Sequence, residues 1–144
     1  MIRILAVGKL KDRRLADLAG DYQRRIRPLA TAEVIELKDQ NPEKEARQML
    51  DKLGSRDGSQ HVVALDERGK SMASTELATL LGKHGSLTFI IGGADGLTDP
   101  VRQRADTVLR LSRMTFTHEM ARVLLLEQVY RGLSILRGMP YHRR

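Results

Sequence analysis

Residues 87–96 read LTFIIGGADG, a short run of strand-forming residues that stops at two adjacent glycines. The run does not alternate between apolar and polar residues, which favours a strand covered on both of its faces. Further runs of this kind lie at residues 2–7, 61–65 and 108–111, and a less regular one lies at residues 32–37. Because strands covered on both faces are typical of parallel sheets, the pattern predicts a parallel sheet.

Helical segments separate these strands. Apolar residues recur at helical spacing over residues 12–26, 42–53 and 118–137. Shorter helices are expected to begin at Ser74 and Thr98, both of which are residue types that cap helix N-termini. Strands that alternate with helices indicate an α/β fold with a parallel sheet covered by helices. At 144 residues we expect a single domain.

The last predicted helix contains four consecutive apolar residues, Val123–Leu126. Consecutive residues point to different sides of a helix, so a single contact surface leaves some of them uncovered. We therefore expect a second copy of the chain to cover this helix, in a homodimer held largely by it. Glutamate at Leu125 or Leu126 is expected to give monomers or insoluble protein.

The chain is basic, and its charge is unevenly distributed. The net charge is +7, with +4 in residues 9–27, +6 in residues 102–144 and −4 in residues 28–101. Clustered arginine favours a polyanionic partner such as nucleic acid, and a generally basic surface is the alternative. The absence of cysteine excludes thiol nucleophiles, cysteine-type zinc sites and disulfides. No apolar run approaches the roughly 20 residues that span a bilayer, so we expect a cytoplasmic protein without a membrane partner.

Three predicted strand ends are candidate ligand sites, because ligands of open α/β sheets bind beyond the carboxyl ends of the strands. They are Leu65, which precedes the expected charged loop 66–70, the pair Gly92–Gly93, and the expected loop 112–117. The glycine spacing fits neither the dinucleotide fingerprint G-x-G-x-x-G nor a phosphate-binding loop with Gly-Lys-Ser/Thr. The glycine pair would either let a ligand approach the backbone or simply form a tight turn.

Two polar segments near the C-terminus carry further candidates. His118-Glu119-x-x-Arg122 resembles half of a zinc-protease motif, but arginine stands where the second histidine ligand belongs, so we expect no metal. His118 is either a proton acceptor or a helix-capping residue. The terminal segment 141–144 joins an aromatic residue and a histidine to two arginines, which suits unpaired RNA bases, although chain ends commonly fray. Four residues apart on one helix, Glu127 and Arg131 are expected to form an ion pair.

Segments along the whole chain resemble those of the RlmH family of small bacterial methyltransferases. The matching segments are Ile4–Lys11, Tyr22, Val63–Lys70, Phe89–Gly96, Leu111–His118, Arg122–Arg131 and Pro140–Arg143. Family members commonly end in Tyr-His-Arg-Glu or Tyr-His-Lys, whereas this chain ends in Arg143-Arg144. The resemblance implies a SPOUT-type α/β fold with a trefoil knot near the C-terminus and a homodimer. It also implies methylation of N3 of a pseudouridine in helix 69 of large-subunit ribosomal RNA.

The resemblance further implies that S-adenosylmethionine binds in the knot loops. The corresponding residues are Leu65, Gly92, Gly93, Ser112, Arg113, Met114, Thr115, Phe116 and Thr117. These residues stand at the same three strand ends that were identified above. Because a branched side chain would block a backbone approach, we expect Gly93→Val to abolish cofactor binding with little loss of fold.

Methylation of N3 requires that the proton on N3 leaves. His118 and His142 are candidate proton acceptors, Arg143 could stabilise a negatively charged base, and Tyr141 could stack on it. Two other classes of function stay open at this stage. One is an RNA-binding protein without catalysis, and the other is a nucleotide-dependent oxidoreductase, whose fingerprint is missing.

Overall fold

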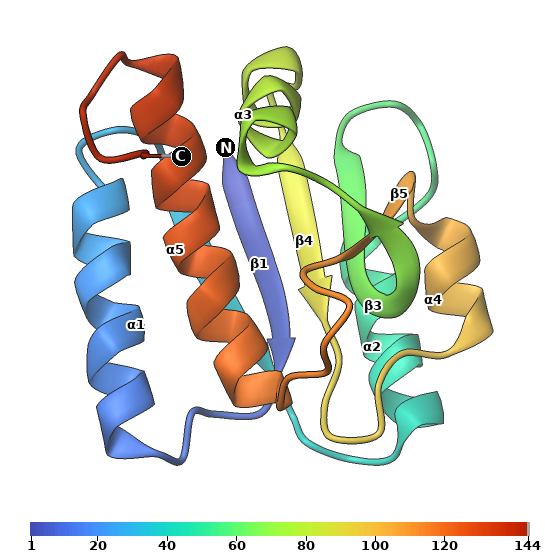
Figure 1. Cartoon of the computed structure of the whole chain (residues 1–144). Coiled ribbons are helices and arrows are strands. Elements are labelled where there is room, and N and C mark those ends of the chain that lie inside the picture. Colours follow the sequence, from blue (N-terminus) through green and yellow to red (C-terminus); the bar gives the residue numbers. More distant parts are fainter. Residues whose placement is uncertain (144) are drawn as a thin grey trace.

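A computed structural model describes residues 1–143 as a five-stranded parallel sheet flanked by five helices (Figure 1). The order of the strands in the sheet is β2-β1-β4-β3-β5, and every pair is parallel. The elements are β1 (Ile2–Val7), α1 (Arg13–Ile26), β2 (Ala32–Leu37), α2 (Pro42–Leu53), β3 (His61–Ser71), α3 (Ser74–Lys83), β4 (Leu87–Ile91), α4 (Asp99–Arg104), β5 (Thr107–Arg110) and α5 (His118–Leu136). The predicted α/β class and parallel sheet are confirmed, and the knot stays a prediction.

The sheet has one core on each face, because successive side chains of a strand point to opposite sides. On β1, Ile4 and Ala6 join the core under α1, α3 and α5, while Leu5 and Val7 join the core under α2 and α4. The middle strand β4 is buried along its whole length, as its unbroken run predicts. Phe89 on β4 is fully buried, which stabilises the fold by about 1.5–3 kcal/mol relative to an exposed ring.

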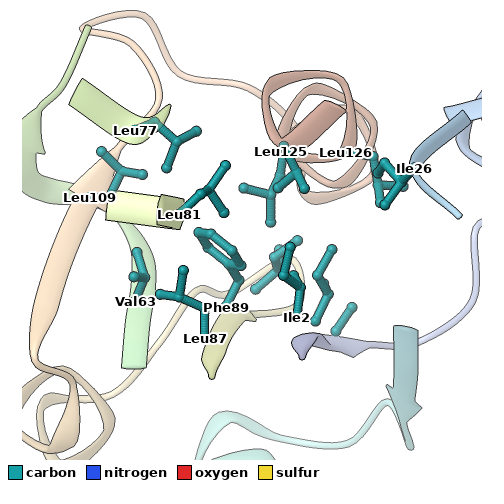
Figure 2. Packing of buried hydrophobic residues seen from close by; sticks show 14 of the residues in the cluster. Ile2, Ile26, Val63, Leu77, Leu81, Leu87, Phe89, Leu109, Leu125 and Leu126 are labelled. Carbon is teal, nitrogen blue, oxygen red and sulfur yellow. The ribbon is translucent and has the colours of Figure 1, made fainter. Parts of the chain in front are cut away.

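Much of helix α5 is buried by its own chain. It packs against α1 on one side and α3 on the other, and it covers the sheet with the side between them. Figure 2 shows Leu125 on the side of Leu81 and Leu126 on the side of Ile26. The prediction that a second copy of the chain buries this helix is therefore wrong for Val123, Leu125 and Leu126, which their own chain covers; Leu124 is half-buried, and the homodimer stays a prediction. Of the helices in residues 1–143, none combines the length and the apolar composition that a bilayer crossing requires.

Strand β3 is longer than predicted. The charged residues 66–70, expected as a loop, bulge out of the sheet after Leu65 and return to pair with β5, so that Leu65 and Lys70 both face Leu109. The return depends on Gly69, because a Cβ there would lie 2.6 Å from the backbone carbonyl of Val108. A glycine at this position lets the two backbones approach closely.

Two expected helix caps differ from the structure. Ser74 is the first helical residue of α3 rather than its cap, and its hydroxyl donates to Gln128 Oε1 at 2.6 Å. Thr98 does occupy the cap position of α4, but its hydroxyl makes no capping bond. The cap residues Asp12 and Asn41 accept backbone hydrogen bonds at the starts of α1 and α2, as their residue types predict.

Candidate functional site

The three predicted strand ends meet around one cleft. Strands β4, β3 and β5 are neighbours in the sheet, so the end of β4, the bulge that follows Leu65 in β3 and the end of β5 lie side by side. The cleft has a volume of about 570 Å³, and its lining combines apolar side chains such as Leu65, Ile91 and Leu109 with charged ones. A concave site of this size, lined by both apolar and polar groups, can hold a small molecule or a cofactor.

The loop 112–117 forms one wall of the cleft and exposes apolar side chains. Met114 is 76% exposed and Phe116 is 40% exposed. The loop is held by Ser112 Oγ, which accepts from the Met114 amide at 3.0 Å, and by Thr117 Oγ1, which caps α5. Exposed apolar groups beside a cleft are suited to contact a ligand.

Nearly all of the residues expected to bind the cofactor line this cleft. Those that do are Leu65, Gly92, Gly93, Ser112, Met114, Thr115, Phe116 and Thr117. Arg113 lies in the same loop, is exposed and does not line the cleft. The structure thus brings together segments that are about 25 and 20 residues apart along the chain, as expected when parallel strands end at a common edge.

The glycine pair is explained by the turn itself. A Cβ at Gly92 would lie 2.8 Å from the carbonyl carbon and oxygen of Gly96, and one at Gly93 would lie 3.2 Å from Val7 and 3.5 Å from Glu45. The turn is closed by Gly96, whose φ is +78° and whose amide donates to the Gly93 carbonyl at 3.0 Å. A side chain at Gly93 would therefore press on Val7 and Glu45, so we expect Gly93→Val to cost some stability, and its effect on cofactor binding stays a prediction.

A buried carboxylate lies close to this turn. Glu45 on α2 is 4% exposed, and its Oε2 accepts from the Gln40 amide at 2.8 Å. Burial raises the pKa of Glu45, and the nearby carboxylates of Asp39 and Asp95 raise it further. The sequence analysis did not find this residue, because its place in a helix between Lys44 and Ala46 has no unusual local feature.

An ion pair fixes the opposite wall. Arg102 on α4 donates to Asp66 Oδ2 at 2.9 Å and to the Leu97 carbonyl at 2.6 Å, and it also binds Asp99. These bonds tie the bulge of β3 to the segment that follows the glycine turn. Asp66 and Arg102 stand 36 positions apart in the sequence, so no local sequence pattern predicts their contact.

The segment His118-Glu119-x-x-Arg122 divides between the cleft and the core. His118, the first residue of α5, is half-buried and lines the cleft. Glu119 accepts from the amides of Lys11 and Asp12, while buried Arg122 donates to the Gly8 carbonyl at 2.7 Å and binds Glu36 at 2.6 Å. The last two side chains hold the start of α5 against the end of β1, so only His118 is available for chemistry in the cleft.

The C-terminal segment turns back along α5 (Figure 1). Gly138, with a φ of +67°, follows the helix, and the Tyr141 hydroxyl reaches Glu127 Oε2 at 2.7 Å. The same hydroxyl lies 3.1 Å from that of Tyr22, and the Tyr141 ring meets the Tyr130 ring edge-on with centroids 4.7 Å apart. The expectation that the tail reaches away from the core is therefore wrong for Tyr141.

The pKa of the Tyr141 phenol is raised by burial first, and then by its bonds to Tyr22 and Glu127. This group is therefore a neutral donor at physiological pH. Tyr22, which the sequence analysis placed only by family resemblance, lies 119 positions from Tyr141, and all three tyrosines of the chain share this cluster.

The expected catalytic residues do not all meet within one chain. His118 lines the cleft, whereas His142 contacts Arg131 at 3.1 Å. At 1.5 Å per residue, Arg131 lies roughly 20 Å along α5 from His118. Arg143 is exposed, and Arg144 lies outside the described residues.

Comparisons with known proteins find relatives that match nearly the whole chain. The family model described as "Predicted SPOUT methyltransferase" matches residues 1–142. The "Ribosomal RNA large subunit methyltransferase H" of Syntrophotalea carbinolica is 45% identical and covers 99% of both chains. The protein of the same name from Synechococcus sp. is 46% identical over 99% of this chain and 94% of its own. A solved structure of a probable methylase family protein from Haemophilus influenzae Rd KW20 covers 99% of this chain and 70% of its own, with a TM-score of 0.60 at 13% identity.

Proposed function

Because this chain belongs to the SPOUT methyltransferase family, we propose that it is a single-domain, cytoplasmic ribosomal RNA methyltransferase that uses S-adenosylmethionine. Its proposed target is N3 of a pseudouridine in helix 69 of the large subunit. The observation that carries the proposal is the cleft of about 570 Å³ beyond the ends of β4 and β5 and beside the bulge of β3. Relatives of nearly the same length, named as large-subunit RNA methyltransferases, support the substrate class.

The residues of the cleft fit such a cofactor. Leu65, Ile91 and Leu109 offer apolar contact to an adenine ring, while the backbone of the loops 92–96 and 112–117 offers hydrogen bonds around it. When bound, S-adenosylmethionine supplies a methyl group on a positively charged sulfur. The chain's task is then to align the target nitrogen with that methyl group and to exclude water.

His118 is the proposed proton acceptor within the cleft. It is half-buried, it lines the cleft, and its neighbours Glu119 and Arg122 hold the start of α5 in place. When the methyl group passes from the sulfur, which is left as a neutral thioether, to N3, the imidazole of His118 or a water molecule beside it would take the proton from N3.

The tail is proposed to act on the RNA in the cleft of a second copy. The roughly 20 Å between His118 and the position of His142 along α5 argues against both working at one site of one chain. In a homodimer, Tyr141, His142 and Arg143 of one copy would complete the site of the other. Stacking and stabilisation of a negatively charged base remain their proposed roles.

Methyl incorporation tests this function. Large-subunit ribosomal RNA from a strain lacking the modification, assembled in ribosomes, is incubated with the protein and S-adenosylmethionine labelled on its methyl group. We expect the label in a single pseudouridine of helix 69, located by mass spectrometry of nuclease fragments. Isothermal titration should show binding of S-adenosylmethionine and none of NAD. Label in another nucleotide would correct the target, and binding of NAD alone would overturn the proposed class of enzyme.

A further inference from the structure

A single contact determines which nitrogen of His142 carries its proton. Arg131 Nη1 and His142 Nδ1 lie 3.1 Å apart. A guanidinium group has five N–H donors and no acceptor, so Nδ1 must accept this hydrogen bond with its lone pair. The neutral ring then carries its proton on Nε2, and Nε2–H can only donate.

Arg131 is itself held in place by other bonds. Its Nη2 lies 2.6 Å from Glu127 Oε2, and its Nε lies 3.4 Å from Glu127 Oε1. The side chains of Arg131 and Glu127 are only 21% and 16% exposed. This two-point pairing leaves Nη1 for His142, and paired groups of this kind have a fixed geometry.

The charged and titratable groups around His142 agree with this assignment. Arg131 faces the ring directly, and the carboxylate of Glu127 is occupied by Arg131 and by the hydroxyl of Tyr141. The guanidinium of Arg131 also lies over the ring of Tyr141, with 4.8 Å from Cζ to the ring centroid. Among residues 1–143, the side-chain hydrogen bond of His142 is the one with Arg131.

We propose that Arg131 is a positioning residue that holds His142 as an Nε2–H donor, and that His142 donates a hydrogen bond to the RNA base instead of removing the N3 proton. This inference rests on the proposed function. N3 of the base lies between two carbonyl groups, and loss of its proton spreads negative charge onto their oxygens. A donor beside either oxygen stabilises that charge in the transition state. The proton on N3 is then removed by His118 in the cleft.

Nitrogen NMR of the histidine-labelled protein measures the tautomer directly and needs no substrate. At mildly alkaline pH we expect His142 to show a proton on Nε2 and none on Nδ1. Arg131→Lys keeps a donor without an acceptor and should preserve this tautomer. Arg131→Gln offers an amide oxygen that can accept, so a proton should appear on Nδ1 in part of the molecules. A wild-type ring with its proton on Nδ1 would overturn the assignment.

Two substitutions at His142 separate a donor from a base. The side-chain amide of glutamine places an N–H donor at the position of the histidine Nε2–H, but it cannot take up a proton. Asparagine is shorter, so its amide oxygen keeps an acceptor near the position of Nδ1, and the donor at the position of Nε2 is lost. We expect kcat/KM of His142→Gln to stay within about tenfold of wild type, and that of His142→Asn to fall about 100-fold, the scale of a lost catalytic group.

The pH profile completes the test. The pH profiles of wild type and His142→Gln should have the same shape, because a side chain that only donates a hydrogen bond adds no limb to the profile. His142 would instead be the base if kcat/KM fell about 100-fold in both variants and if only the wild-type pH profile had an acidic limb. A wild-type protein that methylates no RNA would contradict the proposed function, and the tautomer measured by NMR would still test the assignment.

Discussion

Replacement of Leu125 by alanine tests whether α5 is buried by its own chain. Leu125 is 0% exposed and packs in the core that also contains Leu81 and Phe89. Alanine removes three carbon atoms from a site enclosed by the sheet and by α3, which has little room to collapse. Substitutions of this kind cost about 2–5 kcal/mol, and we expect about 3 kcal/mol here.

Urea unfolding followed by circular dichroism measures this loss. With a slope of about 1–3 kcal/mol per molar urea, the midpoint should fall by roughly 1–3 M. Leu18→Ala is the control, since Leu18 is exposed on α1 and its loss should change the unfolding free energy by less than about 0.5 kcal/mol. The folded Leu125→Ala protein should sediment like wild type. A loss of stability below about 1 kcal/mol, or a change in the oligomeric state of the folded variant, would refute this account of α5.

Three further predictions concern other parts of the fold. Burial, with the stacked ring of His84, lowers the pKa of His61. The free energy of unfolding should therefore fall as the pH drops below the usual histidine pKa of about 6.5. Urea titrations of His61→Gln should no longer show this dependence on pH. Gly69→Ala should cost about 1–3 kcal/mol in the same assay, because its Cβ would overlap the Val108 backbone. Deletion of residues 141–144 should leave the Kd for S-adenosylmethionine within a few-fold and reduce methyl incorporation by about 100-fold or more; full incorporation would make the tail dispensable.

The local elements follow closely from the sequence. The bounds of β1, β2, β4 and α2 agree with the predicted ranges, because unbroken apolar runs, a helical stripe and capping residues such as Asn41 act over a few neighbouring residues. β5 lies one residue earlier than predicted, at Thr107–Arg110. The meeting of three strand ends at one cleft was predictable for the same reason, since parallel strands necessarily end at a common edge.

Partners distant in the chain were not predictable. An apolar pattern indicates that a side chain is buried, but it does not identify the residues that cover it. The pattern around Leu125 therefore suggested a second copy of the chain, whereas α3 covers this residue in the structure. The carboxylate of Glu45 beneath the glycine turn and the bond between Asp66 and Arg102 likewise have no local signature.

The sequence by itself determined the α/β class, the parallel sheet, the strand ends that form the cleft and the resemblance to a methyltransferase family. The tertiary structure alone decided that His118 lies in the cleft, that Arg122 belongs to the core, and that Tyr141 folds back onto Glu127. The physical reason is the range of the interactions. Backbone propensity and periodicity act between neighbours, whereas burial and polar pairing join groups that only the folded chain brings within a few ångströms of each other.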